Sequence, residues 1–151
     1  MFGVIFEIIM SIWNGVLSLD MLNTLNKGTL GEFMEISFTE IGDDYLKATM
    51  PVNNKTKQPF GLLHGGASVA LAETIGSVAS WCAVNRDLFI GVGVEINANH
   101  LLAVTEGLVT AECKAIKVGG KIHVWEVKIS NQETQLCCIC RFTCMIVPKR
   151  K

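Results

Sequence analysis

The stretch that decides the fold is residues 62–85, Leu-Leu-His-Gly-Gly-Ala-Ser-Val-Ala-Leu-Ala-Glu-Thr-Ile-Gly-Ser-Val-Ala-Ser-Trp-Cys-Ala-Val-Asn, in which Glu73 is the only charged side chain. The small and apolar residues around it predict one long helix from about Gly65 to Val84. A lone carboxylate in apolar surroundings is costly unless something compensates for it. A solvated helix face would carry several charges, so we interpret Glu73 as a functional residue.

At about 100° per residue, the predicted helix has two unlike faces. The face around Glu73 is made almost wholly of small residues: Gly66, Val69, Ala70, Gly76, Ser77 and Ser80. The opposite face carries larger apolar residues that we expect to pack on a sheet: Leu71, Ile75, Val78 and Cys82. The helix is therefore expected to leave room around the carboxylate.

The turn His64-Gly65-Gly66 at the predicted helix start has complementary chemistry. The first N–H groups of a helix have no partner within the helix, and the helix dipole makes this end partly positive. A thioester carbonyl on the Gly65 N–H would have its developing oxyanion stabilised there. Gly65 and Glu73 are about 12 Å apart along one helix. If both act on one carbonyl, they come from different subunits with antiparallel helices.

The rest of the chain predicts strands. A short helix is expected over Ser18–Asn26, ended by Gly28, and the period-two alternations are typical of strands. The expected strands are 34–39, 46–52, 90–102, 108–118, 122–130 and 135–147. Strands interrupted by a single long helix favour one curved antiparallel sheet wrapped around that helix, the α+β hotdog architecture. Such a sheet leaves edges exposed, so a homo-oligomer is expected, either a dimer or a dimer of dimers.

Length and composition suit a single domain. The 151 residues are 50% hydrophobic and 18% charged, with a net charge of −1, which gives no electrostatic footprint for nucleic acid. We expect one domain over residues 11–148 and a basic tail over 149–151. Residues 1–10 are apolar but too short to span a bilayer, so no stable membrane insertion is expected. They are either a small oligomer- or membrane-contacting helix, or an extension that is not native, with Met10 as the natural start.

The six cysteines do not resemble a disulfide framework or a zinc site, because four of them crowd into residues 137–144. Cys140 and Cys144 share the parity of Phe142 and Ile146, as buried residues of a strand would. We interpret all six as reduced core thiols of a cytoplasmic protein, and we expect no metal and no cofactor.

The segment from Gln58 to Ser77 resembles the hotdog thioesterases that hydrolyse aromatic acyl-CoAs, within the phenylacetic-acid-type thioesterase superfamily. It is most similar to the group of 1,4-dihydroxy-2-naphthoyl-CoA hydrolases and enterobactin-pathway proofreading thioesterases. Segments 38–52, 95–100 and 124–127 match as well, and the resemblance covers about Ile12 to Val147.

The resemblance implies that Glu73 is the catalytic carboxylate, as nucleophile or as general base for water. It further implies that Gly65 is the oxyanion donor, with Gln58 and His64 around the thioester carbonyl, and that Ser77 positions the water or the acyl group. By sequence alone, His64 could equally be a helix-start histidine bonded to backbone.

The resemblance also implies where the CoA nucleotide would lie. The matching residues are Gly93, His100, Leu101, Leu102, Ala103, Lys117, Val118, Gly119, Gly120, Lys121 and Ile122. Lys117, Lys121 and the Gly119-Gly120 turn could meet phosphates, although a plain hairpin with solvated lysines has the same pattern. Leu102 stands where the family usually has an arginine, which puts one phosphate contact in doubt.

The function expected from these residues is hydrolysis of an aromatic or bulky acyl-CoA, such as a 1,4-dihydroxy-2-naphthoyl-CoA-like thioester, to the free acid and CoA. Two alternatives remain open at this point. One is a non-hydrolytic acyl-CoA-binding hotdog module. The other is a hotdog hydratase or dehydratase, in which an acidic residue and a histidine such as His64 move protons.

Overall fold

The computed structural model of the chain describes residues 11–150, so the expectations on residues 1–10 and on Lys151 lie outside the described residues. Three helices and six strands follow one another in the order α1, α2, β1, β2, α3, β3, β4, β5, β6. Their bounds are α1 Leu19–Leu25, α2 Leu30–Phe33, β1 Ser37–Ile41, β2 Tyr45–Pro51, α3 Gly65–Cys82, β3 Phe89–His100, β4 Leu108–Val118, β5 Ile122–Ser130 and β6 Leu136–Pro148.

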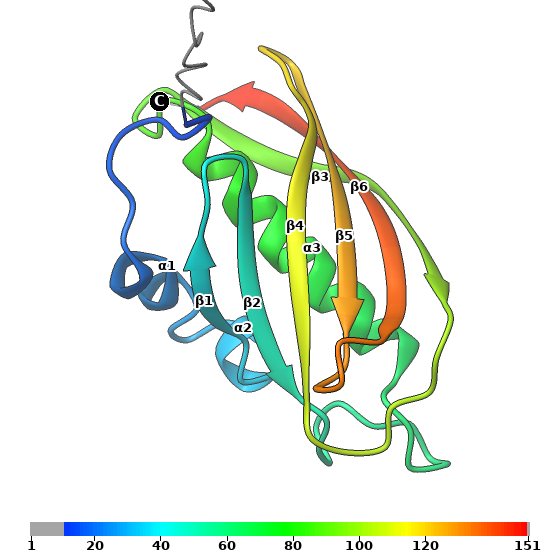
Figure 1. Cartoon of the computed structure of the whole chain (residues 1–151). Helices are drawn as coiled ribbons and strands as arrows, with labels where there is room; N and C mark the ends of the chain where they lie inside the picture. Colours follow the sequence, from blue (N-terminus) through cyan, green and yellow to red (C-terminus); the bar gives the residue numbers. More distant parts are fainter. Residues whose placement is uncertain (1–10, 151) are drawn as a thin grey trace, which may run out of the picture.

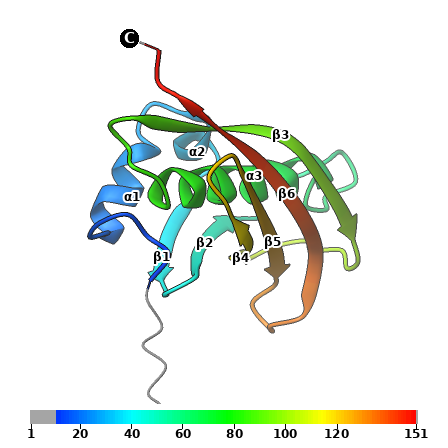
Figure 2. The same ribbon diagram turned by 90° about the horizontal axis from the view of Figure 1, so that it is seen from above.

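The strands form one antiparallel sheet in the order β1-β2-β4-β5-β6-β3. Figures 1 and 2 show this sheet curving around α3, which runs along its concave side. The predicted hotdog architecture is confirmed. The bounds of β4 and β5 agree with the sequence-based expectation, and α3 ends two residues earlier than predicted.

The segment before the sheet differs from the expectation in one respect. The structure confirms α1, with Ser18 as its N-cap accepting a hydrogen bond from the Met21 N–H at 3.2 Å. The four-residue helix α2, capped by Thr29, was not predicted. As a result, the first strand begins at Ser37 rather than at Met34, although Met34 is buried as its place in the alternation suggested.

Helix α3 packs on the sheet through a wider arc than the helical wheel indicated. Leu71, Ile75 and Cys82 are buried, as expected. Gly76 and Ser80 were expected on the open face but are buried too. A Cβ at Gly76 would overlap the ring of Phe142 from β6. The curved sheet therefore covers part of the small-residue face, where small side chains allow strand and helix to approach closely.

Two of the expected helix residues have different surroundings from those predicted. Val78 was expected against the sheet but is only half-buried, because it lies on the side of α3 that the sheet leaves open. The Ser80 hydroxyl accepts a hydrogen bond from the Trp125 indole N–H at 2.8 Å, and Trp13 stacks on Trp125 with ring centroids 6.2 Å apart. Ser80 thus satisfies a polar group inside the core, a role that its small size did not reveal.

All six cysteines are buried and unbridged, so the interpretation as free core thiols is confirmed. The side chains of Cys138 and Cys140 lie 3.7 Å apart, sulfur to sulfur, on the core face of β6. Burial raises the pKa of the Cys82 thiol to about 12 and also raises the pKa of Cys113. These thiols therefore carry no charge at neutral pH.

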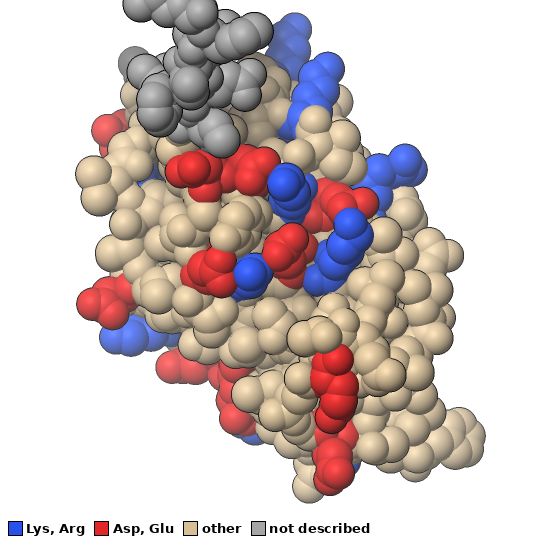
Figure 3. All heavy atoms as spheres, in the orientation of Figure 1, with Lys and Arg blue, Asp and Glu red and all other residues tan. Residues whose placement is uncertain are grey.

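The outer face of the sheet is polar over β1, β2, β4 and β5. Lys47 on β2 forms ion pairs with Glu40 at 3.0 Å and Glu112 at 3.6 Å, and Lys128 pairs with Glu126 at 2.7 Å. Figure 3 shows these opposite charges gathered on one part of the face, while the margin over β6 and β3 is largely free of charge. No helix within residues 11–150 is both long enough and apolar enough to cross a membrane.

Candidate active site

Glu73 lies midway along α3, on the side of the helix that the sheet leaves open. Its side chain is exposed in the single chain, not buried as the apolar sequence around it suggested. It nevertheless lies in a largely apolar groove of about 390 Å³, in which it is the only charged residue among residues 11–150. The groove is lined by Thr29, Leu30, Gly31, Ala70, Glu73, Thr74, Ser77 and Val78. Ser77 lies one helical turn beyond the carboxylate in the same groove.

Gly93 on β3 lies directly against the Glu73 carboxylate. A Cβ at residue 93 would come within 2.7 Å of Glu73 Oε1 and within 3.0 Å of the Phe142 ring. The pairing of β3 with β6 shifts register between Gly93 and Glu95, so a bulge accompanies this close approach. The absence of a side chain at residue 93 therefore leaves the space that the carboxylate occupies. The resemblance had implied a CoA contact for Gly93, and that role stays a prediction.

The N-terminus of α3 has one backbone donor that finds no partner in the described part of the chain. His64 is the N-cap, and its Nδ1 accepts a hydrogen bond from the Gly66 N–H at 2.8 Å. The Gly65 N–H makes no hydrogen bond to any of residues 11–150. Because Nδ1 of His64 accepts, the proton of the neutral ring is on Nε2. The helix start thus presents the Gly65 N–H for an outside acceptor, as the sequence predicted.

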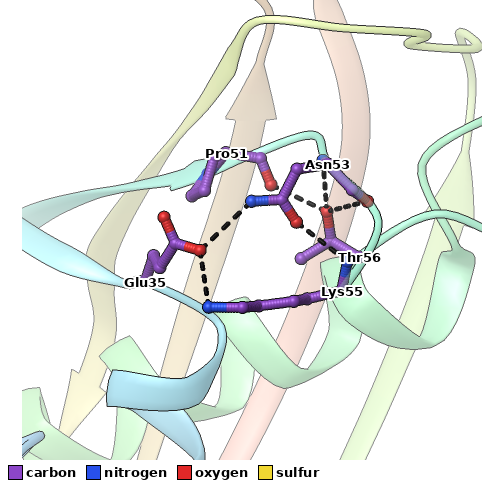
Figure 4. Close-up of polar contacts among 5 residues, drawn as sticks. All are labelled: Glu35, Pro51, Asn53, Lys55 and Thr56. Carbon is purple, nitrogen blue, oxygen red and sulfur yellow. Dashed lines mark hydrogen bonds and ion pairs between the residues drawn. The ribbon is translucent and has the colours of Figure 1, made fainter.

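A network of side chains fixes the loop that precedes α3 (Figure 4). The Glu35 carboxylate accepts hydrogen bonds from Asn53 at 3.2 Å and Lys55 at 2.8 Å. The buried Thr56 hydroxyl accepts from the Asn53 N–H at 3.0 Å and donates to the Pro51 carbonyl at 2.7 Å. These bonds hold the loop two residues before Gln58.

Gln58 is itself held by the loop that it belongs to. Its side-chain oxygen accepts a hydrogen bond from the Phe60 N–H, and its own N–H donates to the Leu62 carbonyl at 2.8 Å. The His64 N–H donates to the Thr56 carbonyl at 2.8 Å, which ties the helix start to the same loop. The Gln58 amide nitrogen makes no hydrogen bond within residues 11–150, so it is a donor that the side chain can offer to a ligand.

A second cavity, of about 380 Å³, opens at the N-terminus of α3. It brings together most of the residues that the sequence placed around the thioester carbonyl and part of the proposed CoA contact. Its lining is Gln58, Leu62, Leu63, Gly65, Ser68, His100, Leu101, Leu102, Ala103 and Cys137. Leu102, which the resemblance places at an arginine position of the family, lines this cavity with an apolar side chain.

The remaining predicted CoA contacts lie at the other end of the sheet. The hairpin Lys117–Ile122 is closed by a hydrogen bond from the Gly119 N–H to the Ile122 carbonyl at 3.1 Å. Ile122 pairs with Met145, which pairs with Val92 near the start of β3, whereas His100 ends that strand. Within one chain the structure does not bring Lys117, Val118, Gly119, Gly120, Lys121 or Ile122 to the cavity beside Gly65.

The catalytic residues implied by the resemblance thus divide between two separate cavities. Gly65 lines one and Glu73 lines the other, and about 12 Å of helix separates them. Sequence reasoning missed Leu30 of α2 as a wall of the Glu73 groove, since a single turn of helix leaves little periodic signal. It also missed the contact of His100 with Gly65, because nothing in the sequence orients the end of a strand.

Comparisons with known proteins show what the chain is similar to in sequence. Residues 60–138 match the model of the thioesterase superfamily. A 1,4-dihydroxy-2-naphthoyl-CoA hydrolase of Escherichia coli is 47% identical over 136 residues, covering 90% of this chain and 99% of the relative. A proofreading thioesterase, EntH, of Cronobacter turicensis is 44% identical over 136 residues, covering 90% and 98%.

Solved structures show the same fold. The crystal structure of a mutant thioesterase of Pseudomonas aeruginosa has a TM-score of 0.90 at 43% identity, covering 92% of this chain and 100% of that one. A thioesterase of Haemophilus influenzae has a TM-score of 0.88 at 42% identity, covering 91% and 95%.

Proposed function

The chain belongs to the thioesterase superfamily, and we propose that it hydrolyses the thioester of an aromatic or bulky acyl-CoA to the free acid and CoA. Its relatives that are named as hydrolases or thioesterases are 42–47% identical to it, and they make it a thioester hydrolase. The observation that carries the proposal is a single carboxylate, Glu73, in a groove whose other described lining residues are all uncharged. The names of the relatives favour a 1,4-dihydroxy-2-naphthoyl-CoA-like substrate.

Two groups on the chain have the chemistry that the reaction needs. The free Gly65 N–H, at the positive end of the α3 dipole, would donate a hydrogen bond to the thioester oxygen as negative charge develops on it. Glu73 would act on the carbonyl carbon, either by attacking it directly or by taking a proton from an attacking water. Direct attack releases the CoA thiolate and leaves an acyl anhydride on Glu73, which water then hydrolyses to the acid and the free carboxylate. In the general-base route the water displaces the CoA thiolate, which takes up the proton that Glu73 had accepted.

We propose that each site is shared between two subunits. About 12 Å separates Gly65 and Glu73 along one helix, so one scissile carbon cannot reach both in the same chain. The edge strand β3 supports a partner, because it is long and pairs only with β6 among the described residues. It contains no Lys or Pro that would block pairing, and Glu95 is its one acidic residue.

Antiparallel pairing of β3 with the same strand of a second copy would give two equivalent sites. The two α3 helices would then run in opposite directions, with Gly65 of one facing Glu73 of the other. The same operation would bring the Lys117–Ile122 hairpin of one subunit to the end of the dimer where His100–Ala103 of the other subunit lie. The two groups of proposed CoA contacts, separate in one chain, would then serve one ligand.

The first test is thiol release from benzoyl-CoA, a 1,4-dihydroxy-2-naphthoyl-CoA-like thioester and several fatty acyl-CoAs, ranked by kcat/KM. We expect the aromatic thioesters to rank highest. Binding without thiol release, or hydration of a 2-enoyl-CoA in place of hydrolysis, would refute the proposal.

The second test is Glu73→Gln, which keeps the shape of the side chain and removes its charge. We expect the fold to persist and kcat to fall by about 10³ or more, since neither a nucleophile nor a base remains. Glu133→Gln, a change in the exposed β5–β6 loop, is the matched control and is expected to leave kcat unchanged.

The third test is sedimentation with a parallel activity assay, which tests the dimer. A fully active monomer would contradict the shared site.

A further inference from the structure

His100, the last residue of β3, points its ring at the start of α3. A Cβ built on Gly65 would lie 2.8 Å from His100 Nε2, 3.1 Å from Cε1 and 3.3 Å from Cδ2. Nε2 is thus the nearest ring atom, and its two ring neighbours are only slightly farther away. The Nε2 atom of the imidazole is therefore directed at Gly65, the residue with the free N–H.

Backbone hydrogen bonds hold both residues in place. The Leu101 and Leu102 N–H groups both donate to the Cys137 carbonyl, at 2.7 and 3.2 Å, which fixes the chain as it leaves β3. The Leu63 N–H donates to the Val104 carbonyl at 2.7 Å, which ties the loop after His100 to the loop before Gly65. The approach of the ring to the helix start is built into the backbone on both sides.

The distances allow one oxygen atom to bind both groups. The N and Cβ positions of a residue are about 2.5 Å apart, by standard bond lengths, so Gly65 N and His100 Nε2 are at most about 5.3 Å apart. Two donors that each lie about 2.9 Å from a shared oxygen are at most about 5.8 Å apart. The described part of the chain contributes no carboxylate to this cavity that would compete for the imidazole N–H.

We propose that His100 Nε2–H is a second oxyanion donor, binding the same thioester oxygen as the Gly65 N–H. This inference rests on the proposed thioesterase function, and it moves His100 from the CoA nucleotide to the reacting carbonyl. The imidazole keeps its proton throughout; it donates a hydrogen bond that strengthens as the carbonyl oxygen becomes negative. His100 is then a catalytic residue in the sense that it touches the reacting group.

The test compares His100→Ala, His100→Gln and His100→Asn. The amide nitrogen of Gln falls near the place of Nε2, whereas that of Asn falls near Nδ1 and does not reach. We expect the Ala and Asn variants to lose about 10²-fold in kcat/KM, largely in kcat, and the Gln variant to recover at least about tenfold of that loss. Thermal unfolding of all three variants checks that they are folded, and a folded Gln variant keeps the test valid if the Ala variant is not.

Each substitution is assayed on two thioesters of one acyl group, the acyl-CoA and the acyl-pantetheine, which lacks the nucleotide. A donor to the carbonyl oxygen predicts the same fold-loss on both. A loss confined to the KM for acyl-CoA would assign His100 to the nucleotide and overturn the inference, as would unchanged kinetics. Wild-type protein that releases no thiol from either substrate would instead refute the proposed function, so the two failures are distinguishable.

Discussion

Substitution of Gly93 by Ala tests how the fold positions Glu73, the proposed catalytic carboxylate. The added Cβ would lie 2.7 Å from Glu73 Oε1 and 3.0 Å from Phe142 Cε2, whereas ordinary contact begins at 3.4 Å. The carboxylate would have to retreat by about 0.7 Å, because Phe142 is fully buried and cannot yield as easily. A misplacement of about 1 Å at a reacting group can cost about 10²-fold in rate, so we expect kcat to fall by about 10- to 100-fold.

The substitution also overpacks the core, which needs a separate control. We expect a loss of about 1–3 kcal/mol in the free energy of unfolding, seen as a fall in Tm of about 2–4 °C per kcal/mol. Gly91→Ala is the matched variant. It lies two residues earlier on β3, and its Cβ would come within 2.8 Å of Cys144 Sγ and 3.2 Å of Ser80 Cβ, without touching Glu73.

The assay is kcat for an aromatic acyl-CoA, measured on both variants beside their thermal unfolding curves. Gly91→Ala should lose stability and retain kcat, whereas Gly93→Ala should lose both. Wild-type kcat in a folded Gly93→Ala variant would refute the argument, because the carboxylate would then act without the space that residue 93 leaves for it.

Three further predictions concern stability and CoA affinity. Burial lowers the pKa of His123 below its ordinary 6.5, and its Nδ1 has no hydrogen-bond partner within residues 11–150. The unfolded chain therefore takes up a proton first, and the free energy of unfolding should fall as pH drops below about 6.5. Urea unfolding from about pH 8 to about pH 5 should show this slope, and His123→Gln should lack it. Ser80→Ala leaves the buried Trp125 indole N–H without an acceptor and should cost about 1–3 kcal/mol in unfolding free energy, a result that an unchanged Tm would contradict. Leu102→Arg should let the guanidinium bind a phosphate of CoA, and so lower KM for acyl-CoA by about three- to tenfold at unchanged kcat. KM for acyl-pantetheine, which lacks the nucleotide, should not change. An equal change on both substrates would exclude a phosphate contact.

The sequence was sufficient for the architecture because its patterns are local. The alternation in 108–118 and 122–130 and the glycines between them define β4 and β5, and His64-Gly65 defines the start of α3. The four residues of α2 gave no comparable signal, because one helical turn is shorter than the period needed to recognise it. Residues Leu30–Phe33 were therefore assigned to no element.

What the sequence could not give is the relation between elements. The helical wheel separated small from large residues, but only the curvature of the sheet shows that Gly76 and Ser80 face Phe142 and Trp125. Glu73 was expected in buried surroundings and lies at the open side of α3, because the sheet ends at β3. The approach of His100 to Gly65 joins two segments more than thirty residues apart, and no spacing rule predicts it.

The burial of the cysteine side chains has a practical consequence for activity assays. A colorimetric reagent such as an aromatic disulfide reacts with thiolates, and a thiol that is covered by neighbours and kept protonated reacts slowly. All six cysteines are buried, and Cys137 is the one that lines the cavity beside Gly65, so the other five should contribute little background in the folded enzyme while the liberated CoA sulfhydryl is counted. Added denaturant would unmask the protein sulfhydryls, and the same reagent would then time the opening of the native state.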